Sequence, residues 1–220
     1  DPVLAWCERE MDASPYHGLM GSRSELSGNP ETGYAVYGVF GNYAMYVALR
    51  ALAQMRASVS GEAGGVAALA DRLERGLGYL VSDGKMSKTE AGCFINGVDA
   101  RDLSAYDTMD FAGSICDCWH WTRQIPFILE ADGCGLPAGP FGEVHEKSYD
   151  FIRRYMAQGY YFRKYGFVSN TGWTGIGDRH DETMCGYGQG FFTQAALLSD
   201  DVNCYGKCLE GVARLGYDGN

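Results

Sequence analysis

Several features are missing from this 220-residue chain, and each absence narrows the range of its functions. No stretch approaches about 18 uninterrupted apolar residues, which is the length that a membrane-spanning helix needs. No run of basic residues occurs, and 28 acidic side chains outnumber 18 basic ones to give a formal charge of −10. A protein with this negative charge is repelled by the phosphate backbone of a nucleic acid. The sequence therefore predicts no membrane span and no nucleic-acid partner.

The short motifs of nucleotide, esterase and zinc sites are also missing. No phosphate-binding loop occurs, and no G-x-G-x-x-G opens a helix after a strand. No G-x-S-x-G turn presents a nucleophilic serine. Cys204 and Cys208 share a helix face, as do Cys116 and His120, but no C-x-x-C pair supports a zinc site. We therefore expect no cofactor and no metal.

Cysteine, in contrast, is frequent. An even and high count favours disulfide bonds and an oxidising compartment, although buried free thiols remain the alternative. The chain opens with Asp1-Pro2 and has no signal-peptide pattern there, which leaves secretion open. We expect a secreted or extracytoplasmic protein with disulfides, whose pairing the sequence does not assign. The eight cysteines are Cys7, Cys93, Cys116, Cys118, Cys134, Cys185, Cys204 and Cys208.

Apolar residues recur at helical spacing along most of the chain, and 46% of all residues are hydrophobic, enough to build a core. Residues 1–32 contain many glycine and proline turn signals, so we expect them to be irregular. No alternating strand pattern lasts, which leaves little room for a sheet. The predicted helices span 36–57, 66–81, 109–130, 143–165, 187–198 and 201–215.

Short turns join these helices in pairs, and long loops separate the pairs. Short turns make neighbouring helices antiparallel. Loops of 20 or more residues, such as 83–107 and 166–186, are uncommon and often functional. The sequence therefore predicts an all-α domain over 1–220, with about three antiparallel helical hairpins and the long loops at one end.

An acidic residue followed by threonine precedes the first helix of each predicted pair. Glu31-Thr32, Asp107-Thr108 and Glu182-Thr183 stand 76 and 75 residues apart. A spacing this regular indicates one structural unit used three times. Helix capping by each acid is the simpler interpretation, because a carboxylate near a helix start is favourable. Capping does not account for the aromatic residues that accompany the three motifs.

The segment 185–198, CGYGQGFFTQAALL, resembles the inner-helix starts of six-hairpin, (α/α)6-barrel glycosidases. This resemblance implies an α/α toroid, in which inner-helix starts surround a sugar-binding cleft and carboxylates there act as general acid and base. Three hairpins correspond to about half a ring. The resemblance therefore implies a partial barrel, which a homo-oligomer or a second chain completes, or a part of a longer protein.

Glycoside hydrolysis requires two carboxyl groups, of which one protonates the leaving oxygen and the other activates water or attacks carbon. The loop 170–182 supplies Asp181 and Glu182 as candidates for these roles. Trp173 could stack on a sugar ring, and Arg179 and His180 could hold a carboxylate or hydroxyls. A solvated acidic loop with internal ion pairs is the alternative interpretation.

A second cluster lies at and just after the start of the third predicted helix. Asp110 is the candidate for the other catalytic carboxylate, with Asp107 and Trp119 as sugar-binding residues. Glu31 and Tyr37 form the third copy of the motif and are expected to bind substrate. Simple capping by each acid again remains the alternative.

Tyr187 and Gln189, at the start of the fifth predicted helix, complete the set of expected substrate contacts. On the same fold, a polysaccharide lyase would use Tyr187 or His180 to remove a proton beside a uronate carboxylate, which Arg179 would neutralise. A third possibility is a non-catalytic, disulfide-stabilised module that binds glycans or assembles with copies of itself. The glycoside hydrolase, acting on an oligo- or polysaccharide, is the leading hypothesis.

Overall fold

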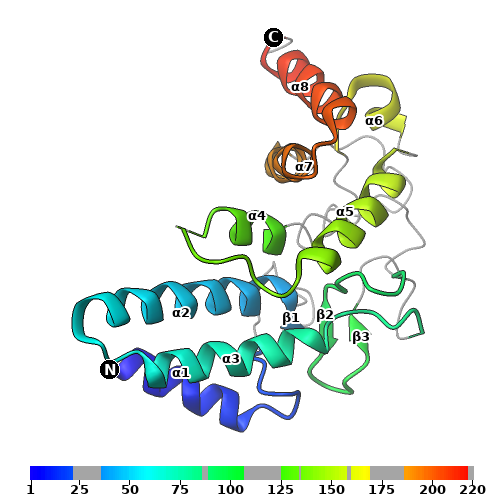
Figure 1. Ribbon diagram of the computed structural model, residues 1–220. Helices are drawn as coiled ribbons and strands as arrows, with labels where there is room; N and C mark the ends of the chain where they lie inside the picture. Colours follow the sequence, from blue (N-terminus) through cyan, green and yellow to red (C-terminus); the bar gives the residue numbers. More distant parts are fainter. Residues whose placement is uncertain are drawn as a thin grey trace.

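The computed structural model of this chain is mostly helical, which confirms the predicted fold class at that level (Figure 1). It describes residues 1–21, 36–85, 89–106, 125–133, 135–157, 160–168 and 186–217. Within these ranges the helices are α1 (Pro2–Ala13), α2 (Val39–Ser60), α3 (Gly64–Gly78), α4 (Ile125–Ala131), α5 (Gly142–Met156), α6 (Tyr160–Tyr165), α7 (Gly186–Leu198) and α8 (Val202–Tyr217). No helix in the described ranges is both long and apolar enough to cross a bilayer.

The first helix, α1, lies in a region that we predicted to be irregular, so that prediction is wrong for Pro2–Ala13. The Asp1 carboxylate caps the helix by accepting a hydrogen bond of 3.0 Å from the Val3 amide. Cys7 and Met11, one helical turn apart, are buried on the inner face. We extended the irregular prediction from the turn signals at the end of this region to its start, where a short helix of about three turns forms.

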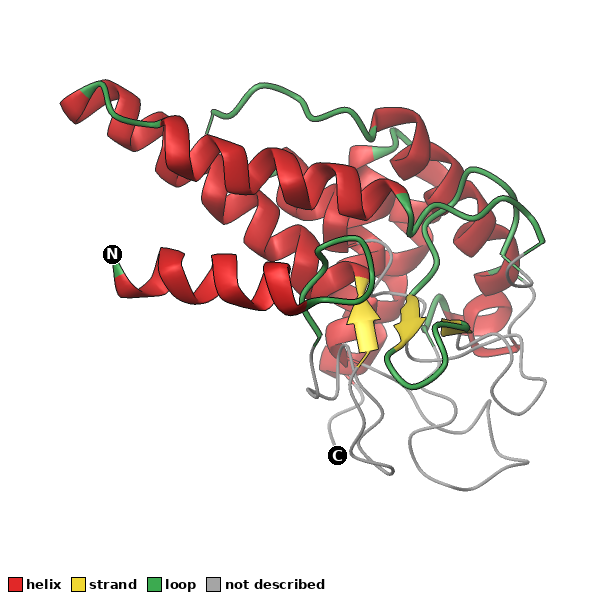
Figure 2. Ribbon diagram, turned by 90° about the horizontal axis from the view of Figure 1, so that it is seen from below, coloured by secondary structure: helices red, strands yellow, loops and turns green. Residues whose placement is uncertain are grey.

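A small antiparallel sheet was not predicted either. It consists of β1 (Val36–Gly38), β2 (Gly97–Asp99) and β3 (Ala105–Tyr106), in that spatial order, and lies at one end of the helical part (Figure 2). A Cβ on Gly97 would lie 2.7 Å from the Tyr37 carbonyl oxygen, so only glycine fits this close strand pairing. Because β1 takes three residues, α2 begins at Val39 rather than at 36.

The remaining helix boundaries agree in part with the prediction. The predicted helix 143–165 is described as two helices, with α5 ending at Met156 and α6 beginning at Tyr160. Only the end of the predicted helix 109–130 is described, as α4. The Asp201 carboxylate caps α8 by accepting a hydrogen bond of 3.0 Å from the Cys204 amide.

The helices pack in a row, whose order in space differs from their order along the chain. The pair α2–α3 forms one antiparallel hairpin, and the pair α7–α8 forms another. Between them, α4 contacts α2 on one side and α7 on the other, while α8 contacts α6. In Figure 1, α1 and α3 lie at the bottom of the molecule, and α6 and α8 lie at the top. The row therefore has two ends, one formed by the N-terminal helices and one by the C-terminal helices.

Two buried clusters hold this row together. The N-terminal cluster joins α1, α2, α3 and the sheet, and its side chains include Tyr43, Leu73 and Phe94. The C-terminal cluster joins α5, α6, α7 and α8, and it includes Phe151 and Phe192. Most of the free energy of folding comes from burying such side chains, at about 1.5–3 kcal/mol for each large one.

Candidate functional site

Most of the residues that we predicted to form the site lie outside the described residues, so their mutual arrangement stays a prediction. These are Glu31, Asp107, Asp110, Trp119, Trp173, Arg179, His180, Asp181 and Glu182. Tyr187 belongs to α7, but its side chain also lies outside the description. The side chains of Tyr37 and Gln189 are described, and they lie in different parts of the protein.

Tyr37, on β1, is almost fully buried, with 7% of its surface exposed. Its ring stacks on Tyr16 at a centroid distance of 5.8 Å. Burial raises the pKa of the Tyr37 phenol, and a hydrogen bond with Ser14 opposes this shift. In the described part of the chain, Tyr37 thus contributes to the packing of the N-terminal cluster.

Gln189, on α7, is also buried and has a full set of backbone partners. Its amide oxygen accepts 2.7 Å from the Val168 amide, and its amide nitrogen donates to the carbonyl oxygens of Gly166 (2.8 Å) and Cys208 (3.1 Å). One side chain therefore joins α7, α8 and the segment that follows α6. These contacts use the amide group, so the expected sugar contact of Gln189 has no support in the described geometry.

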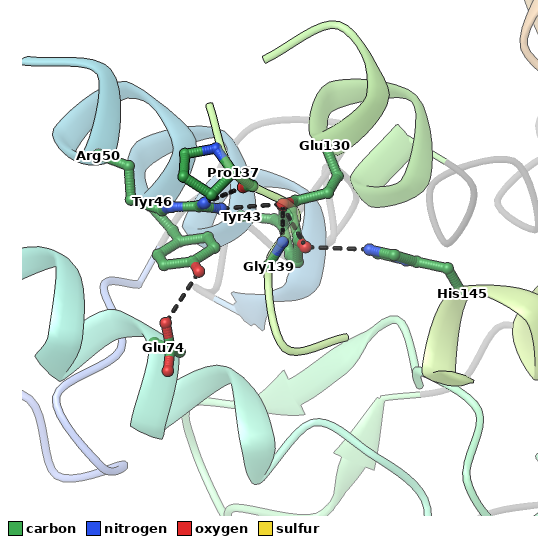
Figure 3. Close-up of polar contacts among 8 residues, drawn as sticks. All are labelled: Tyr43, Tyr46, Arg50, Glu74, Glu130, Pro137, Gly139 and His145. Atoms are coloured by element: carbon green, nitrogen blue, oxygen red, sulfur yellow. Dashed lines mark hydrogen bonds and ion pairs between the residues drawn. The ribbon is translucent and has the colours of Figure 1, made fainter. Parts of the chain in front are cut away.

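The described polar residues that converge most closely surround Glu130, on α4 (Figure 3). Its Oε2 accepts 2.9 Å from the Tyr43 hydroxyl, and its Oε1 accepts 2.9 Å from the Arg50 guanidinium. The Gly139 amide donates a short hydrogen bond to the same Oε1. The second guanidinium nitrogen of Arg50 donates to the Pro137 carbonyl. Glu130 thereby fixes the loop after α4 against α2.

His145, on α5, extends this network. Its Nε2 lies 3.0 Å from the Tyr43 hydroxyl. Because Tyr43 donates its one hydrogen to Glu130, His145 must carry its proton on Nε2 and donate to the Tyr43 oxygen. Nδ1 is then a bare acceptor, and it is buried with no hydrogen-bond partner among the described residues. Burial lowers the pKa of His145 to about 4, and the nearby Glu130 opposes the shift, so the ring is neutral at pH 7.

A second tyrosine of the same helix face links α2 to α3. The Tyr46 hydroxyl donates 2.9 Å to Glu74, and the Arg50 guanidinium lies 5.1 Å from the centre of the Tyr46 ring. Tyr43, Tyr46 and Arg50 are spaced three and four residues apart, so they project from one side of α2. Burial raises the pKa of both tyrosines, which keeps them protonated as donors. Tyr43, Tyr46 and His145 are buried, and Arg50, Glu74 and Glu130 are partly buried. Apart from the His145 Nδ1 atom the network is internally satisfied, so we interpret it as a support for the fold.

A cleft with a volume of about 750 Å³ lies between α5 and the turn from α7 to α8. It is lined by Phe127, Gly142, Glu146, Tyr149, Asp150, Arg153, Leu198, Ser199, Asp200, Asp201 and Asn203. Asp201 accepts a hydrogen bond of 3.0 Å from the Tyr149 hydroxyl and forms an ion pair of 3.2 Å with Arg153, in addition to capping α8. The cleft is at the far end of α7 from the Gly186 start, about 20 Å away along the helix.

The four described cysteines, Cys7, Cys93, Cys204 and Cys208, are buried free thiols. Cys204 and Cys208 lie one turn apart on α8, and a hydrogen bond between them, together with burial, raises the pKa of Cys208. None of these four cysteines forms one of the expected disulfides. No group of three potential metal ligands occurs in the described ranges.

No protein-family model, curated protein or solved structure matches this chain. The functional assignment therefore depends on the residues and on the arrangement of the helices.

Proposed function

We propose that this protein is a glycoside hydrolase built on an arc of an α/α toroid. The observation that carries the proposal is the order of packing, in which α2, α4 and α7 contact one another in sequence. Each of the three is followed along the chain by another helix, α3, α5 and α8 respectively. Inner and outer helices alternate in this way in an α/α toroid, and the chain supplies three such steps.

The predicted carboxylates precede the helices of this row. Glu31 stands before β1 and α2, and Asp107 and Asp110 stand before α4. Glu182 stands four residues before Gly186, the first residue of α7. Carboxylates that stand before the starts of neighbouring helices can face one common pocket. Two-carboxylate hydrolysis needs such an arrangement.

The proposed mechanism assigns one catalytic carboxyl to each of two segments. Asp110 comes from the middle segment, and Glu182 or Asp181 comes from the segment before α7. One group protonates the glycosidic oxygen as the bond to the leaving sugar breaks, while the other activates water or attacks the anomeric carbon. Trp173 and Trp119 supply flat apolar faces for sugar rings.

The partly buried network around Glu130 supports this proposal by making the row rigid. It joins α2, α4 and α5 through side chains whose hydrogen bonds are 2.9–3.0 Å long. A catalytic pair must be held to within a fraction of an ångström, and a site gains that precision from rigid supporting elements. We propose that the substrates are oligo- or polysaccharides. We also propose that the protein acts outside the cytoplasm.

The test is hydrolysis of a panel of aryl glycosides by the wild type and by Asp110→Asn and Glu182→Gln. Each substitution keeps the side-chain size and removes a general acid or base, so kcat should fall by about 10²–10⁴. Glu62→Gln, an exposed carboxylate in the turn between α2 and α3, is the matched control and should keep full activity. Circular dichroism verifies that all variants fold.

Full activity in both Asp110→Asn and Glu182→Gln would refute the assignment. Assaying uronate-containing polysaccharides for an unsaturated product, by its absorbance, separates a lyase from a hydrolase. An inactive wild type on all substrates, with glycan binding retained, would favour the non-catalytic module.

A further inference from the structure

We draw no further inference here: the strongest candidate, the acidic cleft between α5 and the turn from α7 to α8, rests on the carboxylates of Glu146, Asp150, Asp200 and Asp201 alone, and no second feature among the described residues shows what ligand they would bind.

Discussion

Acidification from pH 7 to pH 4.5 is expected to destabilise this protein through one buried residue, His145. The ring is 2% exposed and packs against Phe127, Phe94 and Tyr43. Its pKa is lowered from 6.5 to about 4 in the folded protein, because burial disfavours the charged form. Between these two values the unfolded chain binds a proton that the folded chain does not bind. The free energy of unfolding must therefore decrease as the pH falls through this window.

The size of the effect follows from the two pKa values. A shift of one unit corresponds to about 1.4 kcal/mol, and a fall from pH 7 to pH 4.5 covers most of the window between 6.5 and 4. His145 alone should therefore remove about 2.5 kcal/mol of stability. This is a large share of the total, because domains of this size are stable by about 5–15 kcal/mol. The contribution is fully present above pH 6.5 and lost as the pH approaches 4.

Urea unfolding at pH 7.0 and pH 4.5 measures this difference when the wild type is compared with His145→Phe. The phenylalanine keeps the aromatic packing and cannot be protonated, so its stability should decrease by about 2.5 kcal/mol less than that of the wild type. His17→Asn is the matched control, because His17 is exposed and Asn tolerates its positive φ of 51°. Equal pH dependence in the wild type and in His145→Phe would refute the reasoning.

Four further predictions concern stability and thiol reactivity. Gln189→Ala should lower the free energy of unfolding by about 2–4 kcal/mol, because it leaves buried backbone groups unpaired; an unchanged urea midpoint would contradict this. Glu130→Gln should cost about 2–4 kcal/mol by removing the charge that pairs with Arg50, as measured by the same unfolding assay. Gly166→Ala should cost more than about 2 kcal/mol, since Gly166 has a φ of 78° and an added Cβ would clash with the Lys207 carbonyl oxygen; a thermal melt tests this. Thiol titration should leave Cys7, Cys93, Cys204 and Cys208 slow to react in the native protein and fast in denaturant, and rapid native labelling of these positions would contradict their burial.

The helical hairpins could be predicted because their signals are local. The leucines of α3, Leu69, Leu73 and Leu77, recur every four residues and are buried as expected. Gly61 ends α2 with a φ of 73°, and Asp201 caps α8, as their residue types indicated. In each case the physical cause lies within one helical turn of the residue that reveals it.

The sheet and the Glu130 network could not be predicted, because they depend on contacts between distant segments. Strands of two or three residues are too short to show an alternating pattern. Tyr43 contacts Glu130 and His145 across 87 and 102 residues of sequence. Only the spacing of Tyr43, Tyr46 and Arg50 on one face of α2 hinted at a polar cluster. The carboxylate motifs lie beyond the described ranges, so their convergence remains a prediction.

The dependence of hydrolysis on the leaving group tests the two-carboxylate assignment most directly. A carboxyl that acts only as general acid speeds hydrolysis when the leaving oxygen must be protonated. It contributes little to the rate when the leaving group is dinitrophenolate, which departs without a proton. The account predicts that one of the two variants, Asp110→Asn or Glu182→Gln, hydrolyses dinitrophenyl glycosides almost as fast as the wild type. The same variant should hydrolyse alkyl glycosides far more slowly than the wild type. The other variant should be slow on both. Wild-type rates for both variants on both substrates would contradict the account.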